Sequence, residues 1–208
     1  MLRIYYCTPG RNVPAFPEEL ISGYRKEKLS HQRNERLRRQ SLQTERLLRY
    51  ALHDCGYTVT VALPLITGPH GKPELKDGSL FFSLSHTGDG ILCAVSDSPV
   101  GADLERRRAH ERYEALIRRC FCAAERAYLA ASSEPDDTFT ELWTKKESYI
   151  KLLGHGLSLP LQSFCVLDGS LPVRFYHERR GDNHITVCAE AIAQTPDILE
   201  IHDDALMV

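Results

Sequence analysis

The sequence predicts an α+β fold made of two halves of similar size. Three observations support this prediction: the length of 208 residues, the order of the predicted elements, and a junction with a proline at 97–99. A chain of this length can form two units of roughly 100 residues each. The predicted order is strand, helix and strands, then strand, helices and strands. We therefore predict an N-terminal half at 1–98 and a C-terminal half at 99–208, although the sequence itself shows no repeat.

The N-terminal half contains one predicted helix among several strands. Apolar residues at helical spacing predict that helix from 30 to 55, with Gly56 as its stop. Its apolar stripe consists of Leu37, Leu42, Leu48, Ala51 and Leu52. Runs of β-branched and aromatic residues between turn residues predict extended segments at 2–7, 57–65, 80–85 and 91–95. The last two runs flank a glycine-bearing turn, which indicates a hairpin.

The C-terminal half opens with a strand at 100–105, directly after Pro99. Alternation of apolar and charged residues predicts helices at 110–119, 122–132 and 139–153. Gly154 closes the last of these helices. Glu125 stands three residues after Cys122 and resembles a capping box, although Cys is a weak cap. Further strands are predicted at 164–167, 173–176 and 185–189.

Composition excludes several classes of protein. Lys and Arg number 26 and Asp and Glu 28, so the net charge of −2 argues against a nonspecific nucleic-acid binder. No apolar run approaches the roughly 18 residues of a membrane span, and the start of the chain lacks a signal-peptide pattern. The seven cysteines follow no zinc or disulfide spacing, and Cys120-x-Cys122 has no second pair. We expect reduced thiols in a cytoplasmic protein that binds no membrane.

Two acidic stretches are the strongest chemical signal. Asp103 and Glu105 alternate along a predicted strand, so both side chains leave the same face. Glu147 and Lys151 stand four apart in a predicted helix, which places them on one face about one turn, roughly 5 Å, apart. Three carboxylates from a strand and a helix suit a hard cation such as Mg²⁺, which prefers oxygen ligands. Phosphate chemistry is the function that this pattern favours.

Each half of this pattern also has an ordinary explanation. The strand carboxylates can be surface groups neutralised by the arginines at 106–108, and Glu147 with Lys151 is a common helix ion pair. The helix also carries Trp143 and apolar residues, so it is packed and its carboxylate is positioned.

Other candidates are weaker when taken singly. Ser85-His86 ends an apolar strand and offers a hydroxyl and an imidazole to a phosphate, although a turn residue without a role is equally compatible. Lys72 lies in a loop stiffened by Pro73 and suits a phosphate, or it is a solvated loop lysine. Arg33 and Arg36 fall on one side of the predicted helix and can clamp a phosphate, or they form part of a solvated face.

Several motifs together resemble a known family, the Sfp-type 4′-phosphopantetheinyl transferases. The family pattern appears as Gly-x-Asp-x-Glu at 101–105, Phe-x-x-x-Glu at 121–125 and Trp-x-x-Lys-Glu-x-x-x-Lys at 143–151. The segments at 71–73, 85–86 and 154–160 match it in order and spacing. The similarity spans about residues 30 to 166.

The resemblance implies a magnesium-dependent enzyme, with Mn²⁺ as a possible substitute. It would transfer 4′-phosphopantetheine from coenzyme A to a serine of an apo acyl or peptidyl carrier protein and release adenosine 3′,5′-bisphosphate. The implied fold is a pseudo-twofold pair of α/β halves, with coenzyme A bound by the first half and the metal and carrier protein by the second. We expect it to act as a monomer.

The resemblance also implies roles for single residues. Asp103, Glu105 and Glu147 would hold the metal and, with Lys151, form the catalytic group. The residues implied in coenzyme A binding are Arg33, Arg36, Arg46, Lys72, Pro73, Ser85, His86, Asp103 and Lys151. Lys151 would steady charge on the phosphates, and either Glu147 or a metal-bound water would take the serine proton. The arginines at 106–108 and 118–119, with Leu116, Ile117 and Phe121, would form a basic rim around an apolar patch for the carrier, or a plain surface helix.

Three positions depart from the family pattern. Ala102 replaces Ile or Val, Glu45 stands where a basic residue is often found, and Cys122 replaces a Ser or Thr cap. Two other functions remain open at this point. A carboxylate metal site also serves phosphodiester hydrolysis, and a noncatalytic module can bind coenzyme A or dock a carrier without modifying it. The pathway of the carrier, the tolerance for acyl-coenzyme A and the role of Glu45 are also open.

Overall fold

The computed structural model describes residues 1–10, 15–109, 113–192, 194–202 and 206. Its helices are α1 (Gly23–His31), α2 (Glu35–Asp54), α3 (Glu114–Cys120), α4 (Ala123–Ala130) and α5 (Pro135–Leu153). Its strands are β1 (Leu2–Cys7), β2 (Leu65–Thr67), β3 (Pro73–Leu75), β4 (Phe81–His86), β5 (Ile91–Ser96), β6 (Val100–Arg106), β7 (Arg174–Arg180), β8 (Asn183–Ala189) and β9 (Ile198–Ile201). The predicted α+β class is confirmed.

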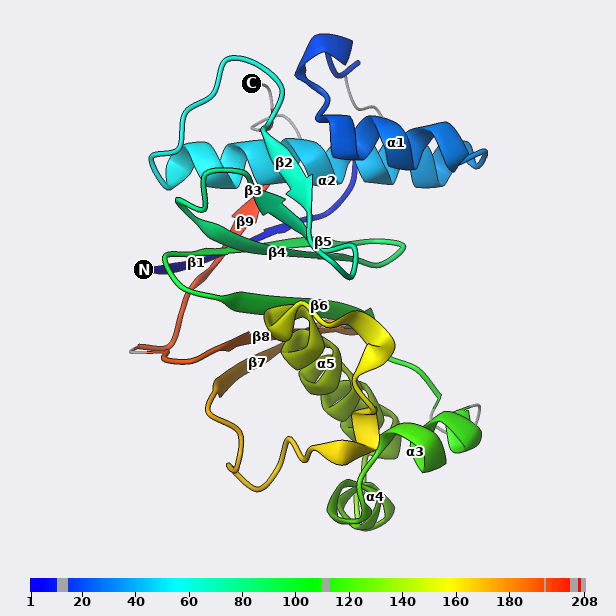
Figure 1. Ribbon diagram of the computed structural model, residues 1–208. Helices are drawn as coiled ribbons and strands as arrows, with labels where there is room; N and C mark the ends of the chain where they lie inside the picture. Colours follow the sequence, from blue (N-terminus) through cyan, green and yellow to red (C-terminus); the bar gives the residue numbers. More distant parts are fainter. Residues whose placement is uncertain (11–14, 110–112, 193, 203–205, 207–208) are drawn as a thin grey trace.

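The first sheet is built around the N-terminal strand. Its strand order is β4-β5-β1-β9, in which β1 runs antiparallel to β5 and parallel to β9. Figure 1 shows the red β9 beside the blue β1, so a segment near the end of the chain completes the sheet of the first half. Strands β2 and β3 form a separate short hairpin, and the loop that joins them lines a cavity together with residues of α5.

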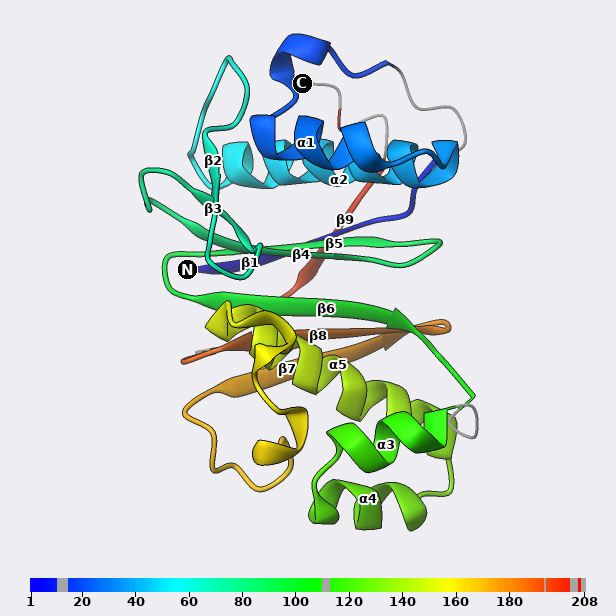
Figure 2. The same ribbon diagram turned by 45° about the vertical axis from the view of Figure 1, so that its right-hand side comes forward.

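The second sheet has the order β6-β8-β7 and is antiparallel throughout. Four layers result, with α1 and α2 above the first sheet and α5 below the second (Figure 1). Apolar residues of β1, β5, β6, β8 and β9 form a core between the two sheets. Helices α3 and α4 lie at the N-terminal end of α5, as Figure 2 shows, and share a second core with it. Burial of these apolar surfaces is the main driving force that holds the layers together.

The sequence predicted most strands and α5 correctly, and the helix predicted at 30–55 is present as α2 from 35 to 54. Only its start was misplaced, because residues 32–34 separate it from a preceding helix, α1, that was not predicted. The side chain of Asn34 accepts hydrogen bonds from the backbone N–H groups of Arg36 and Leu37, and this cap starts a new helix. Leu37, which the apolar stripe included, lies in the first turn of α2 and is 43% exposed.

Two segments predicted to be extended are not strands, because side chains take their backbone hydrogen bonds. The guanidinium of Arg49 donates to the carbonyl oxygens of Val59 and Val61 at 3.0 and 2.8 Å. Near 164–167, the carbonyl of Phe164 accepts from Lys146, and Val166 N–H donates to Glu125. Strand β9, the partner of β1, was not predicted from the sequence.

The other predicted elements agree with the structure within a few residues. The helix predicted at 110–119 is α3, and its first residues, 110–112, lie outside the described part of the chain. The division into halves at 98 and 99 and their pseudo-twofold relation stay predictions. No helix among the described residues has the length and apolar character needed to cross a membrane.

Candidate active site

The candidate site forms where β6 packs against α5, and Gly101 makes this packing possible. A Cβ atom at this position would lie 1.9 Å from the carbonyl oxygen of Ser148 and 2.5 Å from the backbone nitrogen of Leu152. Both are backbone atoms of the helix and cannot move aside as a side chain would. The glycine that opens the acidic motif therefore lets the strand approach the helix that carries Glu147 and Lys151.

Lys151 joins the strand to the helix through a short ion pair. Its Nζ lies 2.7 Å from Oδ1 of Asp103 and 3.0 Å from Oγ of Ser85. Ser85 on β4 in turn donates to the same Asp103 oxygen at 2.9 Å. Residues from β4, β6 and α5 thus meet at one point, as the sequence analysis predicted for these side chains.

The three carboxylates repel one another. Burial, reinforced by the Asp103 carboxylate, raises the pKa of Glu147 to about 7, although Lys151 opposes the shift. Burial and Asp103 also raise the pKa of Glu105, against the effect of Arg108. Arg108 lies 2.6 Å from Glu105, so this carboxylate already has one cationic partner.

One oxygen of Asp103 is left without a partner. Asp103 is buried, and its Oδ2 accepts no hydrogen bond from the described residues. A buried carboxylate oxygen without a donor is costly unless a ligand or ion completes it. Together with the crowding of Glu105 and Glu147, this observation fits a cation held by oxygen ligands. The ligand atoms of the three carboxylates do not all lie within 4.8 Å of one another. Among the described residues, only Cys122, Glu125 and Cys165 form a group with that spacing.

Two adjoining cavities open at this point. One, of about 370 Å³, is lined by the acidic group together with Ser85, His86, Trp143 and Lys151. The other, of about 310 Å³, extends between α1, the 70–73 loop, β4 and α5. The residues that line both are Leu84, His86, Glu147 and Lys151. An elongated ligand can therefore lie along both cavities, with Lys151 at their junction.

The second cavity is basic. Lys72 lines it beside Pro73, and its Nζ donates to the carbonyl oxygen of Val100 at 3.2 Å. Burial, together with the charge of Lys151, lowers the pKa of Lys72, while Glu74 opposes the shift. The pKa of His86 is lowered by burial and by the positive charges of Lys151, Arg25 and Lys28. An anionic ligand would relieve this concentration of positive charge.

The three arginines that the family resemblance implied lie outside both cavities. Arg33 is exposed in the segment between α1 and α2. Arg36 is exposed and donates to the carbonyl oxygen of Gly88 at 3.0 Å. Arg46 is buried, with its guanidinium 5.3 Å from the centre of the Phe16 ring. Contacts between these side chains and coenzyme A stay predictions.

Helix α1 supplies cavity residues that the sequence analysis missed. Arg25 and Lys28 stand three apart on α1 and line the cavity with Tyr24. Ser22 caps this helix by accepting a hydrogen bond from the backbone N–H of Arg25. The serine cap followed by two basic residues at helical spacing was the available signal, but the prediction of one helix from 30 onward hid it.

Glu45, the acidic residue at a position that is often basic, lies beneath α1. It is fully buried, and its carboxylate lies 3.1 Å from Nε of Arg25. It also accepts a hydrogen bond from the backbone N–H of Ser22 at 2.9 Å. Glu45 therefore holds the start of α1 and orients Arg25 at the edge of the cavity.

Two other motif residues form a buried ion pair beneath the site. Lys146 Nζ lies 2.8 Å from the Glu125 carboxylate, and both side chains are fully buried. Glu125 also accepts from the backbone N–H of Cys122 at 2.8 Å, so the capping interaction predicted at α4 is present. This pair is too enclosed to meet a substrate, and it fixes the part of α5 that carries Glu147.

The C-terminal half of the chain matches a family model. Residues 99–196 match the model described as the 4′-phosphopantetheinyl transferase superfamily. This range contains β6, α5 and all three carboxylates of the site. It excludes the basic residues of α1 and the 70–73 loop, whose place in the site follows from the cavity that they line.

Named relatives match between 43% and 61% of the chain. The chain is 38% identical to 4′-phosphopantetheinyl transferase Sfp of Bacillus subtilis (strain 168) over 103 residues, which are 48% of this chain and 45% of the relative. It is 36% identical to 4′-phosphopantetheinyl transferase psf-1 of Bacillus pumilus over 131 residues, or 61% and 54%. It is 34% identical to 4′-phosphopantetheinyl transferase AcpT of Salmonella typhimurium over 94 residues, or 43% and 49%.

These matches span about half the length of each relative. They agree with the motifs at 101–105, 121–125 and 143–151, all of which lie inside the matched family range. The resemblance to Sfp-type enzymes is thus confirmed, and it is carried by residues 99–196, which match the 4′-phosphopantetheinyl transferase superfamily.

Proposed function

We propose that this protein transfers the 4′-phosphopantetheine group of coenzyme A to a serine of an apo carrier protein. The observation that carries the proposal is the junction at Lys151, where the acidic group of β6 and α5 meets the basic cavity. Carboxylates beside a basic cavity suit a pyrophosphate that is held by cations on both sides. The other product would be adenosine 3′,5′-bisphosphate.

Mg²⁺ fits the acidic end of the site. Asp103, Glu105 and Glu147 would hold it, and the uncompleted Oδ2 of Asp103 is the observation that supports this assignment. When bound, the ion would neutralise charge on the pyrophosphate oxygens, and Mn²⁺ offers the same chemistry. Its positive charge would also offset the mutual repulsion that adds to burial in raising the pKa values of Glu105 and Glu147.

The basic cavity would receive coenzyme A. Lys72 and His86 line it with Pro73, and Arg25 and Lys28 add positive charge at its α1 side. Ser85 lies at the acidic end, where its hydroxyl contacts both Asp103 and Lys151. We propose that phosphate groups of coenzyme A bind these side chains. Since one chain supplies residues on every side of the cavity, we further propose that the protein acts as a monomer.

The transfer step needs positioning and charge neutralisation more than covalent help from the protein. The carrier serine oxygen would attack the β-phosphorus, and the bond from that phosphorus to the bridging oxygen would break. Lys151 would stabilise the negative charge that develops on the phosphate oxygens. Among this chain's own groups, we propose Glu147 to take the serine proton, because its carboxylate lies at the junction of the two cavities.

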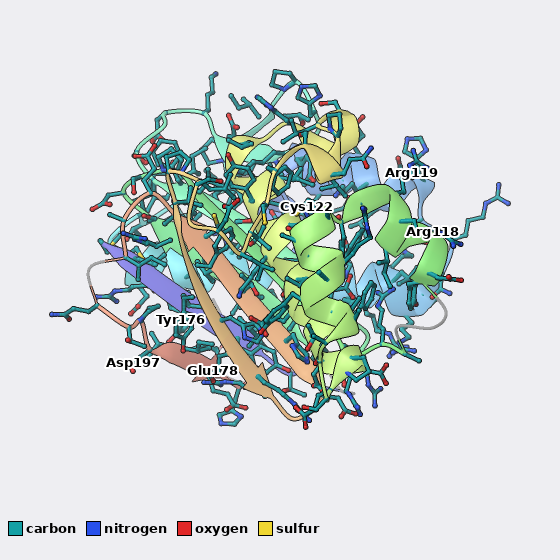
Figure 3. All side chains as sticks on the ribbon, turned by 90° about the horizontal axis from the view of Figure 1, so that it is seen from below. Arg118, Arg119, Cys122, Tyr176, Glu178 and Asp197 are labelled. Carbon is teal, nitrogen blue, oxygen red and sulfur yellow. The ribbon has the colours of Figure 1, made fainter. Side chains whose placement is uncertain are left out.

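A surface beside the site suits the carrier protein. Arg118 and Arg119 are exposed on α3, as Figure 3 shows, and a groove of about 400 Å³ runs next to them. Its lining residues include Leu116, Arg119, Trp143, Leu159 and Pro160. Phe121, which we expected in the apolar patch of this surface, is fully buried and packs against Phe139 instead. We propose that the groove receives an acidic helix of the carrier.

The seven cysteines of the chain all carry free thiols. Reduced thiols in this number are typical of a reducing compartment. They support our proposal that the protein acts in the cytoplasm.

Fluorescent coenzyme A tests the site assignment. The wild-type protein with Mg²⁺ should label an apo carrier protein, whereas Asp103→Ala and Glu147→Ala should each abolish the labelling. Lys145→Met is a matched control, because Lys145 lies on the same helix but its side chain pairs with Glu141 instead of lining either cavity. Undiminished labelling by either alanine variant would overturn the metal assignment, and cleavage of coenzyme A without a carrier would indicate a hydrolase.

A further inference from the structure

Two cysteines and a glutamate converge outside the proposed active site. Ligand atoms of Cys122, Glu125 and Cys165 lie within 4.8 Å of one another. Cys122 is the N-terminal cap of α4, where Figure 3 shows it, and Cys165 belongs to the loop that precedes β7. Both thiols are half-buried, so solvent reaches the cluster from one side.

The carboxylate of Glu125 is already oriented toward the two cysteines. Its Oε2 accepts from Cys122 N–H at 2.8 Å, and its Oε1 accepts from Val166 N–H at 2.9 Å. The two backbone N–H groups that hold the carboxylate thus belong to Cys122 and to Val166, the residue after Cys165. A carboxylate oxygen has two acceptor positions, and Oε1 has one such bond among the described residues. It can therefore serve a further cation.

The charge of the cluster also suits a divalent cation. Two thiolates and one carboxylate around such an ion leave one net negative charge. Lys146, whose Nζ lies 2.8 Å from Oε2 of Glu125, carries the compensating positive charge. Because the Glu125 carboxylate is fully buried, a cluster that is neutral as a whole avoids the large cost of an uncompensated charge.

We propose that Cys122, Cys165 and Glu125 form a second metal site, separate from the acidic group of the transfer site. Sulfur ligands select a thiophilic ion of the Zn²⁺ class over Mg²⁺. Each thiol releases its proton to solvent as it binds, and a water molecule from the open side completes a tetrahedral set.

The site would connect two segments that hold Lys146. The loop at 161–166 contributes the Leu161 and Phe164 carbonyl oxygens that accept from its ammonium group at 2.8 and 2.9 Å. Helix α4 contributes Glu125 to the same group. An ion across Cys122 and Cys165 would fasten this loop to α4 and stabilise the surroundings of the residue that precedes Glu147.

Cadmium is a suitable probe, because thiolate ligands give its complex a strong ultraviolet charge-transfer band. We expect reduced, metal-free wild-type protein to bind one Cd²⁺ with this band, and Zn²⁺ to displace it. Cys122→Ser and Cys165→Ser should each lose the band. Serine is a good helix cap, so Cys122→Ser should fold normally. Cys55→Ser is the matched control, since Cys55 is the other half-buried thiol, and it should retain the band.

A thermal measurement makes the test independent of the absorbance. Zn²⁺ should raise the melting temperature of the wild type and of Cys55→Ser but leave that of Cys165→Ser unchanged. The proposal is overturned if the band persists in both Cys122→Ser and Cys165→Ser, or if the reduced wild type binds no Cd²⁺. Formation of a Cys122–Cys165 disulfide by peroxide in a protein that binds no metal would identify an oxidisable thiol pair instead.

Discussion

Two lysines of α5 make ion pairs of nearly equal length in very different surroundings. Lys146 lies 2.8 Å from Glu125, and Lys151 lies 2.7 Å from Asp103. The side chain of Lys146 is 0% exposed, whereas that of Lys151 is 30% exposed and lines both cavities of the site. The difference lies in what surrounds each pair.

The two pairs differ in how far neighbouring residues satisfy their hydrogen-bonding groups. Lys146 also donates to two backbone carbonyl oxygens and lies 4.3 Å from the centre of the Phe164 ring. Asp103, in contrast, keeps a buried oxygen without a donor among the described residues and shares its cavity with two further carboxylates. A satisfied pair of this kind supports the fold, and an incomplete one points to a ligand.

The largest expected effect is on stability, at the fully buried pair of Lys146 and Glu125. Lys146→Met leaves the buried carboxylate of Glu125 without its cation and should lower the free energy of unfolding by about 3–5 kcal/mol. Urea unfolding followed by circular dichroism measures the change. A loss below about 1 kcal/mol would contradict the structural role of this pair.

Lys151→Met should act mainly on the chemical step. Removing the cation that faces the reacting phosphates should slow transfer by roughly 10²–10³-fold. The measurement is the initial rate of carrier labelling at saturating coenzyme A, with circular dichroism to confirm folding. A rate equal to that of the wild type would place Lys151 with the structural lysines.

Glu147, which lines both cavities beside Lys151, predicts a pH dependence of stability in metal-free buffer. Because the pKa of Glu147 rises from about 4.5 in the unfolded chain to about 7 in the folded protein, its contribution is fully present below pH 4.5. It is lost as the pH rises to about 7, by an amount on the order of 1–3 kcal/mol. Glu147→Gln should therefore gain stability over the wild type across this window, and no further above it. A constant difference between the two proteins from pH 4.5 to 8 would contradict the raised pKa of Glu147.

The smallest effect is expected at a third lysine of the same helix. Lys145 pairs with Glu141 at 2.5 Å, one turn earlier on the same helix, and the side chains are 17% and 30% exposed. Lys145→Met should change stability by less than about 1 kcal/mol and leave the transfer rate unaltered. Urea unfolding and carrier labelling measure the two quantities in parallel. A large loss of stability or of rate would mean that any lysine substitution on α5 is harmful, whatever surrounds its ion pair.

The sequence predicted those parts of the site that local spacing determines. Asp103 and Glu105 share a strand face, Glu147 and Lys151 share a helix face, and the structure brings all four together around Ser85. The α+β class and most strands also followed from periodicity. Residues whose position depends on one element were therefore predictable.

Features that depend on contacts between distant segments were not predictable. Arg25 reaches the cavity because Asn34 starts a new helix and Glu45 anchors α1, and periodicity shows neither interaction. Strand β9 is defined by its pairing with β1 at the other end of the chain. The role of Lys146 likewise appears only when Glu125 and the carbonyl oxygens at 161 and 164 are brought around it.

The most direct test of the central claim is the intact mass of an apo carrier protein after incubation with this protein, Mg²⁺ and coenzyme A. The proposed transfer site around Lys151 and Asp103 predicts that the carrier gains the mass of one phosphopantetheine with the wild type and with Lys145→Met. It predicts no gain with Asp103→Ala. A carrier whose mass stays unchanged with the folded wild-type protein, across acyl and peptidyl carriers, would contradict the proposed transfer.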